Sequence, residues 1–287
     1  MSLAVVASIT AAVVLVGTVI TGYLCIDREA FSDTTENLDH RVYDVAPYFF
    51  VTGVFFLIKR FTHEPSVQIQ KAIGWEITSI LYGMEGLLVA RIQDIAPSFS
   101  IPVFSALYMF GFPYLLIAPL VLYLLSSQTR ALKTLLFAYM LNYVVGQICY
   151  TLFVAYGPRV HLEQVDGLMY QAYPMTQDMT GAVSAATDVF PSLHTSLAVV
   201  VLLVAWQTRD SHPRWYKITA VIATGIVLST MVLGIHWFID VLAGIVLAVW
   251  SVYAARRIVR YTERHSLIRP DFLPTPSTGD SSSRSDD

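Results

Sequence analysis

The sequence predicts an all-α fold, a polytopic membrane helical bundle of about eight transmembrane helices. Composition is the first reason, because 55% of the 287 residues are hydrophobic and only 14% are charged, against about 25% charged in soluble proteins. The second reason is the mean hydropathy of +0.58. The third is the recurrence of apolar runs that approach the roughly 20 residues a spanning helix needs. Cys25 and Cys149 lie in or beside such runs and show no disulfide framework or zinc-binding spacing.

The apolar segments follow one another from the N-terminus, and each is expected to form one helix. The first run has no basic region before it, so it is expected to be a retained helix and not a cleaved signal peptide. The second segment is short, and the third carries Glu76 and Glu85 inside an apolar pattern. The expected helices are Leu3–Leu24, Asp44–Leu57, Gly74–Ile92, Ile101–Ser126, Ala131–Tyr156, Pro191–Trp206, Ile218–Ile235 and His236–Ala255.

Basic residues divide unevenly between the two sides of these segments. With eight spans and both termini in the cytoplasm, fourteen of the eighteen Lys and Arg residues lie inside, and only Arg28, Arg41, Arg91 and Arg159 lie outside. This distribution agrees with the positive-inside rule. The protein is therefore expected to be an integral protein of the plasma membrane. Its net charge of −3 argues against a nucleic-acid partner, and the sequence does not indicate the oligomeric state.

Three regions are expected along the chain. Residues 1–62 form an N-terminal two-helix membrane segment, residues 63–262 a six-helix catalytic membrane core, and residues 263–287 a disordered polar cytoplasmic tail rich in Ser and Pro. The longest loop between spans runs from Gly157 to Val189. Loops of this length are often functional, and this one is placed to cover a site at the outer face.

The tetrapeptide Pro191-Ser192-Leu193-His194 stands where a polar loop turns into an apolar helix. Pro191 suits the first position of a helix, which places Ser192 and His194 in the first turn. A helix start presents free backbone N–H groups and a partial positive charge, and both favour an anion such as phosphate. Ser192 and the backbone amides after it are therefore predicted to bind phosphate.

His236 and Asp240 are four residues apart, so they share one helix face with about 5–6 Å between their Cβ atoms. His236 can attack phosphorus through one ring nitrogen while Asp240 holds the other. His194, on a different helix, can protonate the departing oxygen and then activate the acceptor. Arg159, at the end of the preceding span, can bind phosphate oxygens through its guanidinium fork. The predicted site therefore has His236, His194 and Asp240 as catalytic residues, with Arg159 and Ser192 binding phosphate at the outer face.

Each of these residues also has a simpler interpretation. An isolated His or Asp at a helix start can be a cap, and Arg159 can be an interfacial anchor. Two histidines and a carboxylate can hold a divalent metal ion, but no second acidic cluster supports such a centre, so neither a metal nor another cofactor is expected. Glu76 and Glu85, nine residues apart, fall on roughly opposite faces of one helix and are left out of the predicted site.

The motifs resemble those of the type-2 phosphatidic acid phosphatase (lipid phosphate phosphatase) superfamily, which has a six-helix core. Pro191-Ser192-Leu193-His194 matches its Pro-Ser-x-His block, and His236-x3-Asp240, followed by Val-Leu-Ala-Gly, matches the core of its His-x3-Asp block. The resemblance covers roughly Gly74 to Ala255. It implies that His236 is the nucleophile, Asp240 its orienting carboxylate and His194 the general acid and base, without a metal.

Two departures from the family's pattern remove cations. Ser229-Thr230 stands where the phosphatases have Ser-Arg, and the Lys-x6-Arg-Pro block is reduced to Pro158-Arg159. This loss looks like the inositol-phosphorylceramide-synthase and sphingomyelin-synthase branches, which transfer a phospho-headgroup between lipids. The spelling Phe-Pro-Ser-Leu-His-Thr from Phe190 onward also looks like the inositol-phosphorylceramide-synthase branch.

The first prediction is therefore a membrane lipid-phosphate phosphatase that works through a phosphohistidine intermediate at the non-cytoplasmic face. The alternative is a phosphotransferase that moves a phospho-headgroup between lipids. A more remote alternative, a non-catalytic transporter or assembly protein, stays open because Glu76 and Glu85 lie inside an expected span. The expected partners are a lipid phosphate substrate and the surrounding membrane lipids.

Overall fold

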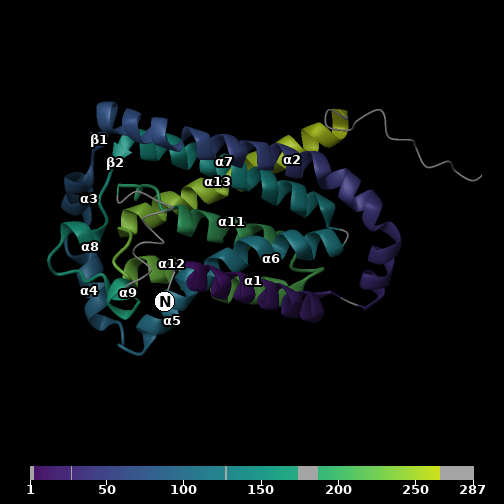
Figure 1. Ribbon diagram of the computed structural model, residues 1–287, viewed down its shortest axis with the longest axis horizontal. Helices are drawn as coiled ribbons and strands as arrows, with labels where there is room; N and C mark the ends of the chain where they lie inside the picture. The colour runs from purple at the N-terminus through teal and green to yellow at the C-terminus, as the bar shows by residue number, and fades with distance from the viewer. Residues whose placement is uncertain (1–2, 27, 127, 174–186, 266–287) are drawn as a thin grey trace, which may run out of the picture.

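The computed structural model describes residues 3–26, 28–126, 128–173 and 187–265. In this part of the chain, long α-helices run side by side between two ends of one bundle (Figure 1). We call the end that holds His194 and His236 the site end, and the other the far end. The predicted all-α class is confirmed, apart from a parallel ladder in which β1 (Trp75–Glu76) pairs with β2 (Phe153–Val154).

Two helices precede the core. Helix α1 (Leu3–Cys25) runs from the site end to the far end, where the Leu24 carbonyl accepts a hydrogen bond of 2.7 Å from Arg214. Helix α2 (Arg28–Ile73) returns along the bundle. It has 46 residues and continues through Pro47 and Pro65, so the predicted segment Asp44–Leu57 was too short. Polar residues precede and follow the apolar stretch, so hydropathy alone does not show that the helix extends beyond it.

The predicted span Gly74–Ile92 is wrong. This stretch forms β1 and two short helices, α3 (Thr78–Glu85) and α4 (Leu88–Ile95), which lie at the site end (Figure 1). Gly86 ends α3 at a φ of +57°, a left-handed conformation that glycine adopts without steric cost. Because the chain turns there, the segment covers the site end and does not cross the bundle.

The remaining helices alternate in direction through the core. Helix α5 (Ser100–Ala106), the π-helical turn η1 (Leu107–Gly111) and α6 (Phe112–Leu125) follow one another toward the far end, and α7 (Thr129–Leu152) returns. The short helices α8 (Pro158–His161) and α9 (Leu168–Ala172) lie at the site end. The last three are α11 (Leu193–Gln207), α12 (Pro213–Val232) and α13 (Phe238–His265).

Helix α11 occupies the centre of the bundle, where it packs against α6, α7, α12 and α13. Its buried residues Leu197, Val200 and Val201 belong to the largest hydrophobic cluster. The helix begins at Leu193, two residues after the predicted start at Pro191, because Ser192 is its N-cap.

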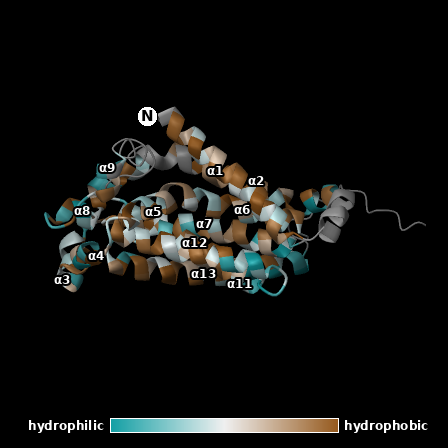
Figure 2. Cartoon of the chain, turned by 90° about the horizontal axis from the view of Figure 1, so that it is seen from below, coloured by the Kyte–Doolittle hydropathy of each residue, from teal (hydrophilic) through white to brown (hydrophobic). Residues whose placement is uncertain are grey.

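Six of the described helical segments are long and apolar enough to cross a membrane. Figure 2 shows hydrophobic residues along the helices and hydrophilic residues gathered toward the two ends. The protein is therefore an integral membrane protein. Eight spans are not shown, since Gly74–Ile92 does not cross and α11 has only 15 residues. The six segments are Val5–Cys25, Leu38–Ile58, Ser100–Leu125, Thr129–Leu152, Pro213–Val232 and Phe238–His265.

The first and last described residues lie at opposite ends of the bundle. Val6 packs in a cluster with Tyr108 and Leu233 at the site end. Helix α13 finishes at the far end, where Thr262 Oγ1 lies 3.2 Å from Tyr48 Oη. The described chain thus begins and ends at opposite ends of the bundle, whereas both termini were expected on one side of the membrane. Helix α2 also continues across residue 62, the expected domain boundary, and residues 266–287 of the expected tail lie outside the described residues.

Candidate active site

His236 sits in the short link between α12 and α13 and is 3% exposed. Gly234 turns the chain there with a φ of +67°, which is accessible to glycine at little cost. The N–H groups of Ile235 and His236 then both donate to the Thr230 carbonyl, at 2.9 and 3.0 Å. The histidine backbone is therefore fixed before α13 begins.

Asp240 lies in the first turn of α13 and is fully buried. The two residues were expected to share a helix face, but His236 precedes the helix. Asp240 Oδ2 accepts a hydrogen bond of 2.8 Å from the Trp237 N–H. The same oxygen is 3.6 Å from His236 Nδ1, which is longer than a hydrogen bond. Catalytic hydrogen bonds are often this long before substrate binds. The contact leaves Nε2 as the ring nitrogen that faces away from the carboxylate.

His194 is the second residue of α11, and its ring centroid lies 6.3 Å from that of His236. The ring is stacked on Tyr108 at 4.4 Å and contacts Phe112 at the same centroid distance. Tyr108 Oη also lies 3.5 Å from His194 Nδ1. The two predicted histidines therefore meet at one place, although they are 42 residues apart in sequence.

Ser192 lies beside these residues, but its side chain is committed to the helix start. Its Oγ accepts a hydrogen bond from the Thr195 N–H at 3.3 Å and donates one to Thr195 Oγ1 at 3.0 Å. Its own N–H donates to the Asp240 carbonyl at 3.1 Å. Phosphate binding by Ser192 stays a prediction, and the bonds present make it the N-cap that ties α11 to α13.

Arg159 belongs to α8, beyond β2, and not to the end of α7 as predicted. Its N–H donates to the Gly234 carbonyl at 3.0 Å, which places the residue against the His236 link. Its Nη2 donates to Tyr170 Oη at 2.9 Å, and the guanidinium lies 4.6 Å from the Tyr170 ring centroid. Its Nη1 is buried and has no hydrogen-bond partner among the described protein atoms.

Burial lowers the pKa of His236, and the nearby Arg159 guanidinium lowers it further. A lowered pKa keeps the imidazole ring neutral, which is the form that can act as a nucleophile. His236 Nδ1 and Asp240 Oδ1, like Arg159 Nη1, are buried without a hydrogen-bond partner among the described protein atoms. Buried polar groups are usually paired. His236 Nδ1 and Asp240 face each other, so Arg159 Nη1 is the atom that marks a place for a polar ligand.

A family model described as the PAP2 superfamily matches residues 84–254, more than half of the 287 residues. The chain belongs to the PAP2 superfamily. The matched range includes all five residues of the predicted site. The resemblance seen in the motifs is thereby confirmed at the level of the superfamily. Membership of this superfamily suggests lipid phosphatase or phosphotransferase activity. No curated protein and no solved structure matches the chain.

Three aromatic residues of this PAP2 superfamily member surround the site without having been predicted there. Tyr108 and Phe112 contact His194 from η1 and the start of α6, and Tyr170 holds Arg159 from α9. Of the three, only Tyr170 lies in the long loop from Gly157 to Val189, which was expected to cover the site. The π-helical turn η1 is itself a feature that recurs at functional sites. Residues 174–186 of that loop lie outside the described residues.

The two glutamates left out of the site prediction do not share a helix in this PAP2 superfamily protein, contrary to expectation. Glu76 lies in β1, and its carboxylate accepts a hydrogen bond from the Thr78 N–H at 2.8 Å. Glu85 ends α3 and reaches the start of α13. Within the described residues, no group of three or more His, Cys, Asp or Glu side chains is arranged to hold a metal ion.

Proposed function

We propose that the protein is a membrane lipid-phosphate phosphatase that works through a phosphohistidine intermediate. The observation that carries the proposal is the buried Arg159 Nη1, which has no hydrogen-bond partner among the described protein atoms and belongs to a residue bonded to the link that carries His236. A phosphate placed there would pair with the guanidinium and lie beside a neutral imidazole. Superfamily membership supports the same reaction class.

The reaction follows from the arrangement of the three catalytic groups. His236 Nε2 attacks phosphorus, and the bond from phosphorus to the lipid oxygen breaks as His194, which enters the step as the protonated ring, gives that oxygen its proton and becomes neutral. Asp240 stabilises the positive charge on the phosphorylated ring through Nδ1. His194 then takes a proton from water, whose oxygen attacks phosphorus and breaks the P–N bond. Inorganic phosphate leaves, and His236 is neutral again.

A second candidate function, transfer of a phospho-headgroup to another lipid, is favoured by the charge at the site. Arg159, which bonds to the His236 link and lowers the pKa of His236, brings one guanidinium to the site. A phosphate monoester carries a charge of about −1.5 to −2 at pH 7, whereas a phosphodiester carries a single negative charge. The single positive charge of one guanidinium therefore balances the charge of a diester. The phospho-headgroup of the diester would pass to His236 and then to a lipid hydroxyl, which takes the place of water.

We propose that the site faces away from the cytoplasm, in the plasma membrane. Most cations of the described chain lie toward the far end, which the positive-inside rule assigns to the cytoplasm. Toward the site end stand Lys59, Arg60 and Lys71, which follow the span Leu38–Ile58 in α2, and Arg91 and Arg159. The far end carries Arg28, Arg41, Arg130, Lys133, Arg209, Arg214, Lys217, Arg256, Arg257, Arg260 and Arg264.

The deciding experiment offers the purified full-length protein, in lipid nanodiscs, a panel of lipid phosphate monoesters and diesters. Phosphate release and headgroup transfer to an added lipid alcohol are followed together, with and without EDTA. Release alone supports the phosphatase, and transfer without release supports the phosphotransferase. Neither product, with substrate moving across a sealed membrane, would overturn both and favour a transporter. Strong inhibition by EDTA would contradict the reaction without a metal.

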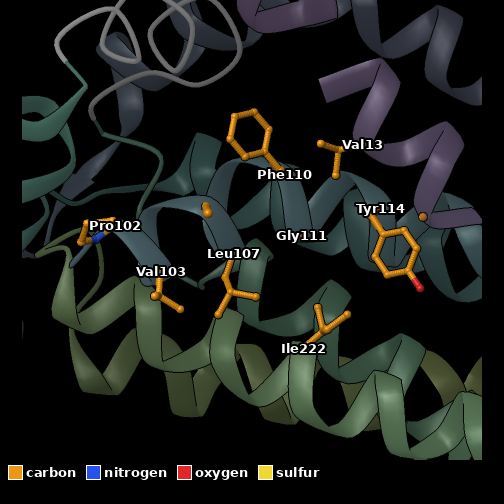
Figure 3. A pocket seen from close by; sticks show the side chains of 10 residues that line it. Val13, Pro102, Val103, Leu107, Phe110, Gly111, Tyr114 and Ile222 are labelled. Atoms are coloured by element: carbon orange, nitrogen blue, oxygen red, sulfur yellow. The ribbon is translucent and has the colours of Figure 1, made fainter. Parts of the chain in front are cut away.

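We propose that the substrate's hydrocarbon chain lies in an apolar cavity close to the π-helical turn η1. This cavity, of about 640 Å³ and largely open on one side, has almost entirely apolar walls and lies between α1, the α5–η1–α6 helix and α12. Figure 3 shows its lining side chains, including Val13, Leu107 and Ile222 from these three elements. Leu107 precedes Tyr108, which stacks on His194. Because the cavity lies along membrane-spanning segments, hydrocarbon is the ligand that fits it.

Filling this cavity should weaken long-chain substrates selectively. Ala106→Phe places a ring in the cavity and should lower kcat/KM for a long-chain lipid phosphate about 10- to 20-fold, the equivalent of two buried methylene groups. A short-chain soluble ester should be turned over as before. Val221→Phe is the matched control, because Val221 precedes Ile222 but is 73% exposed. Equal losses with both chain lengths, or in both variants, would contradict a chain-binding cavity.

Arg159 is expected to bind the transferred phosphate. Arg159→Gln should lower kcat/KM about 10- to 100-fold, because a charge-assisted hydrogen bond to phosphate is lost. Arg159→Lys should recover only part of this, since an ammonium lacks the planar fork. Tyr170→Phe, which removes the hydroxyl that accepts from Nη2, controls for the orientation of the guanidinium. If Arg159→Gln had the kinetics of wild type, Arg159 would not bind the phosphate and would act only as an interfacial anchor.

A further inference from the structure

Glu85 makes a contact with the catalytic helix that neither the motifs nor the superfamily match assigns. Its Oε2 accepts a hydrogen bond from the Phe238 N–H at 2.8 Å, and its Oε1 accepts one from the Ile239 N–H at 3.1 Å. These are the first two residues of α13. The carboxylate therefore caps a helix that begins 153 residues later in the chain.

The start of α13 needs such a partner. The first N–H groups of a helix have no acceptor within the helix, and the residue before α13 is Trp237, whose side chain can only donate. Asp240 accepts the Trp237 N–H, and Glu85 accepts the next two. Two carboxylates thus satisfy three consecutive N–H groups that immediately follow His236.

The segment that carries Glu85 is fixed against the same helix start. Ile77, Leu81 and Val89 of the α3–α4 segment belong to one hydrophobic cluster with Trp237. Trp237 is fully buried, and its Nε1 donates to the Tyr156 carbonyl at 2.8 Å. Residues on both sides of His236 are therefore held, by Thr230 before it and by the α3–α4 segment after it.

We propose that Glu85 is a positioning residue of the active site, which holds the first turn of α13 so that His236 and Asp240 keep their mutual geometry. The inference rests on the proposed function. Glu85 acts through the backbone of Phe238 and Ile239 and does not itself touch phosphate. Its carboxylate also places negative charge at the positive end of the helix, which favours the positive ring of a phosphorylated His236.

The test compares Glu85→Ala, Glu85→Gln and Glu76→Gln in the purified full-length protein. Loss of the carboxylate should lower kcat about 100-fold with KM within about twofold, as expected for a small misplacement of reacting groups. Glu85→Gln keeps one carbonyl acceptor and should lose less than Glu85→Ala. Glu76 is the matched control, because its carboxylate bonds only within its own segment, to Thr78 and Ser79, and Glu76→Gln should behave as wild type.

Hydrogen exchange in the peptide covering 236–243 supplies a readout that does not depend on activity. Exchange at Phe238 and Ile239 should quicken about fivefold to tenfold in Glu85→Ala, as when a helix cap is lost, and stay unchanged in Glu76→Gln. Faster exchange with an unchanged kcat would show that Glu85 stabilises the helix but does not position the active site. Unchanged exchange would show that Glu85 does not cap α13. If wild type turns over no lipid phosphate, the proposed function fails, and exchange alone then decides whether Glu85 holds the helix.

Discussion

His236→Ala is expected to lower the rate of lipid-phosphate turnover by about 10⁴-fold or more, the size of effect seen when a covalent nucleophile is removed. Among the described residues of the candidate site, the other imidazole, His194, is assigned to proton transfer, and Arg159 is a cation. Wild type, quenched during turnover of a radiolabelled lipid phosphate, should carry acid-labile label on the protein. The alanine variant should carry none.

The matched control for this prediction is His161→Ala. The His161 ring lies 6.0 Å from that of Trp237, so its removal disturbs the same neighbourhood without touching His194 and His236 of the candidate site. It should leave turnover and labelling close to those of wild type. Continued turnover by His236→Ala would remove the nucleophile assignment, and label found in that variant would place the intermediate on another residue.

His236 and Asp240 were expected to be close because they are four residues apart on one helix. The structure brings them within 3.6 Å in another way, because His236 lies in the link before α13 and Asp240 in its first turn. The meeting of His194 with His236 was predictable for a different reason, since both were expected to begin helices at the same side of the membrane. That inference survived an incorrect count of spans, because the direction of α11 and α13 depends only on α12 crossing between them.

What the sequence did not reveal depends on contacts between distant segments. Tyr108 reaches His194 through the π-helical turn η1, and such a turn has no signature in the apolar pattern around it. Glu85 was judged by its place in an expected span, whereas its carboxylate is used by α13. The error over 74–92 has the same origin, since hydropathy alone could not distinguish a crossing helix from two short helices that pack on Trp237.

Asp240→Asn is expected to lower kcat by about 10⁴-fold while the protein stays folded, because the change reverses the tautomer of the nucleophile. The Asn side chain keeps an oxygen that can accept from the Trp237 N–H, so the helix start is preserved. Its NH2 group would then face His236 Nδ1 and make that nitrogen an acceptor. The ring proton would move to Nε2, the nitrogen that attacks phosphorus, and the nucleophile would be blocked.

Two measurements separate this explanation from a loss of structure. Thermal unfolding of Asp240→Asn should stay near that of wild type, and hydrogen exchange at Trp237 should not change, since its acceptor remains. Asp166→Asn is the control, because Asp166 lies at the same end of the bundle and its carboxylate bonds to Gln171; its kcat should be unaffected. An inverted tautomer should leave about 10⁻⁴ of the wild-type kcat. If Asp240→Asn kept more than about a tenth of it, Asp240 would only cap α13. The orientation of His236 would then depend on its backbone alone.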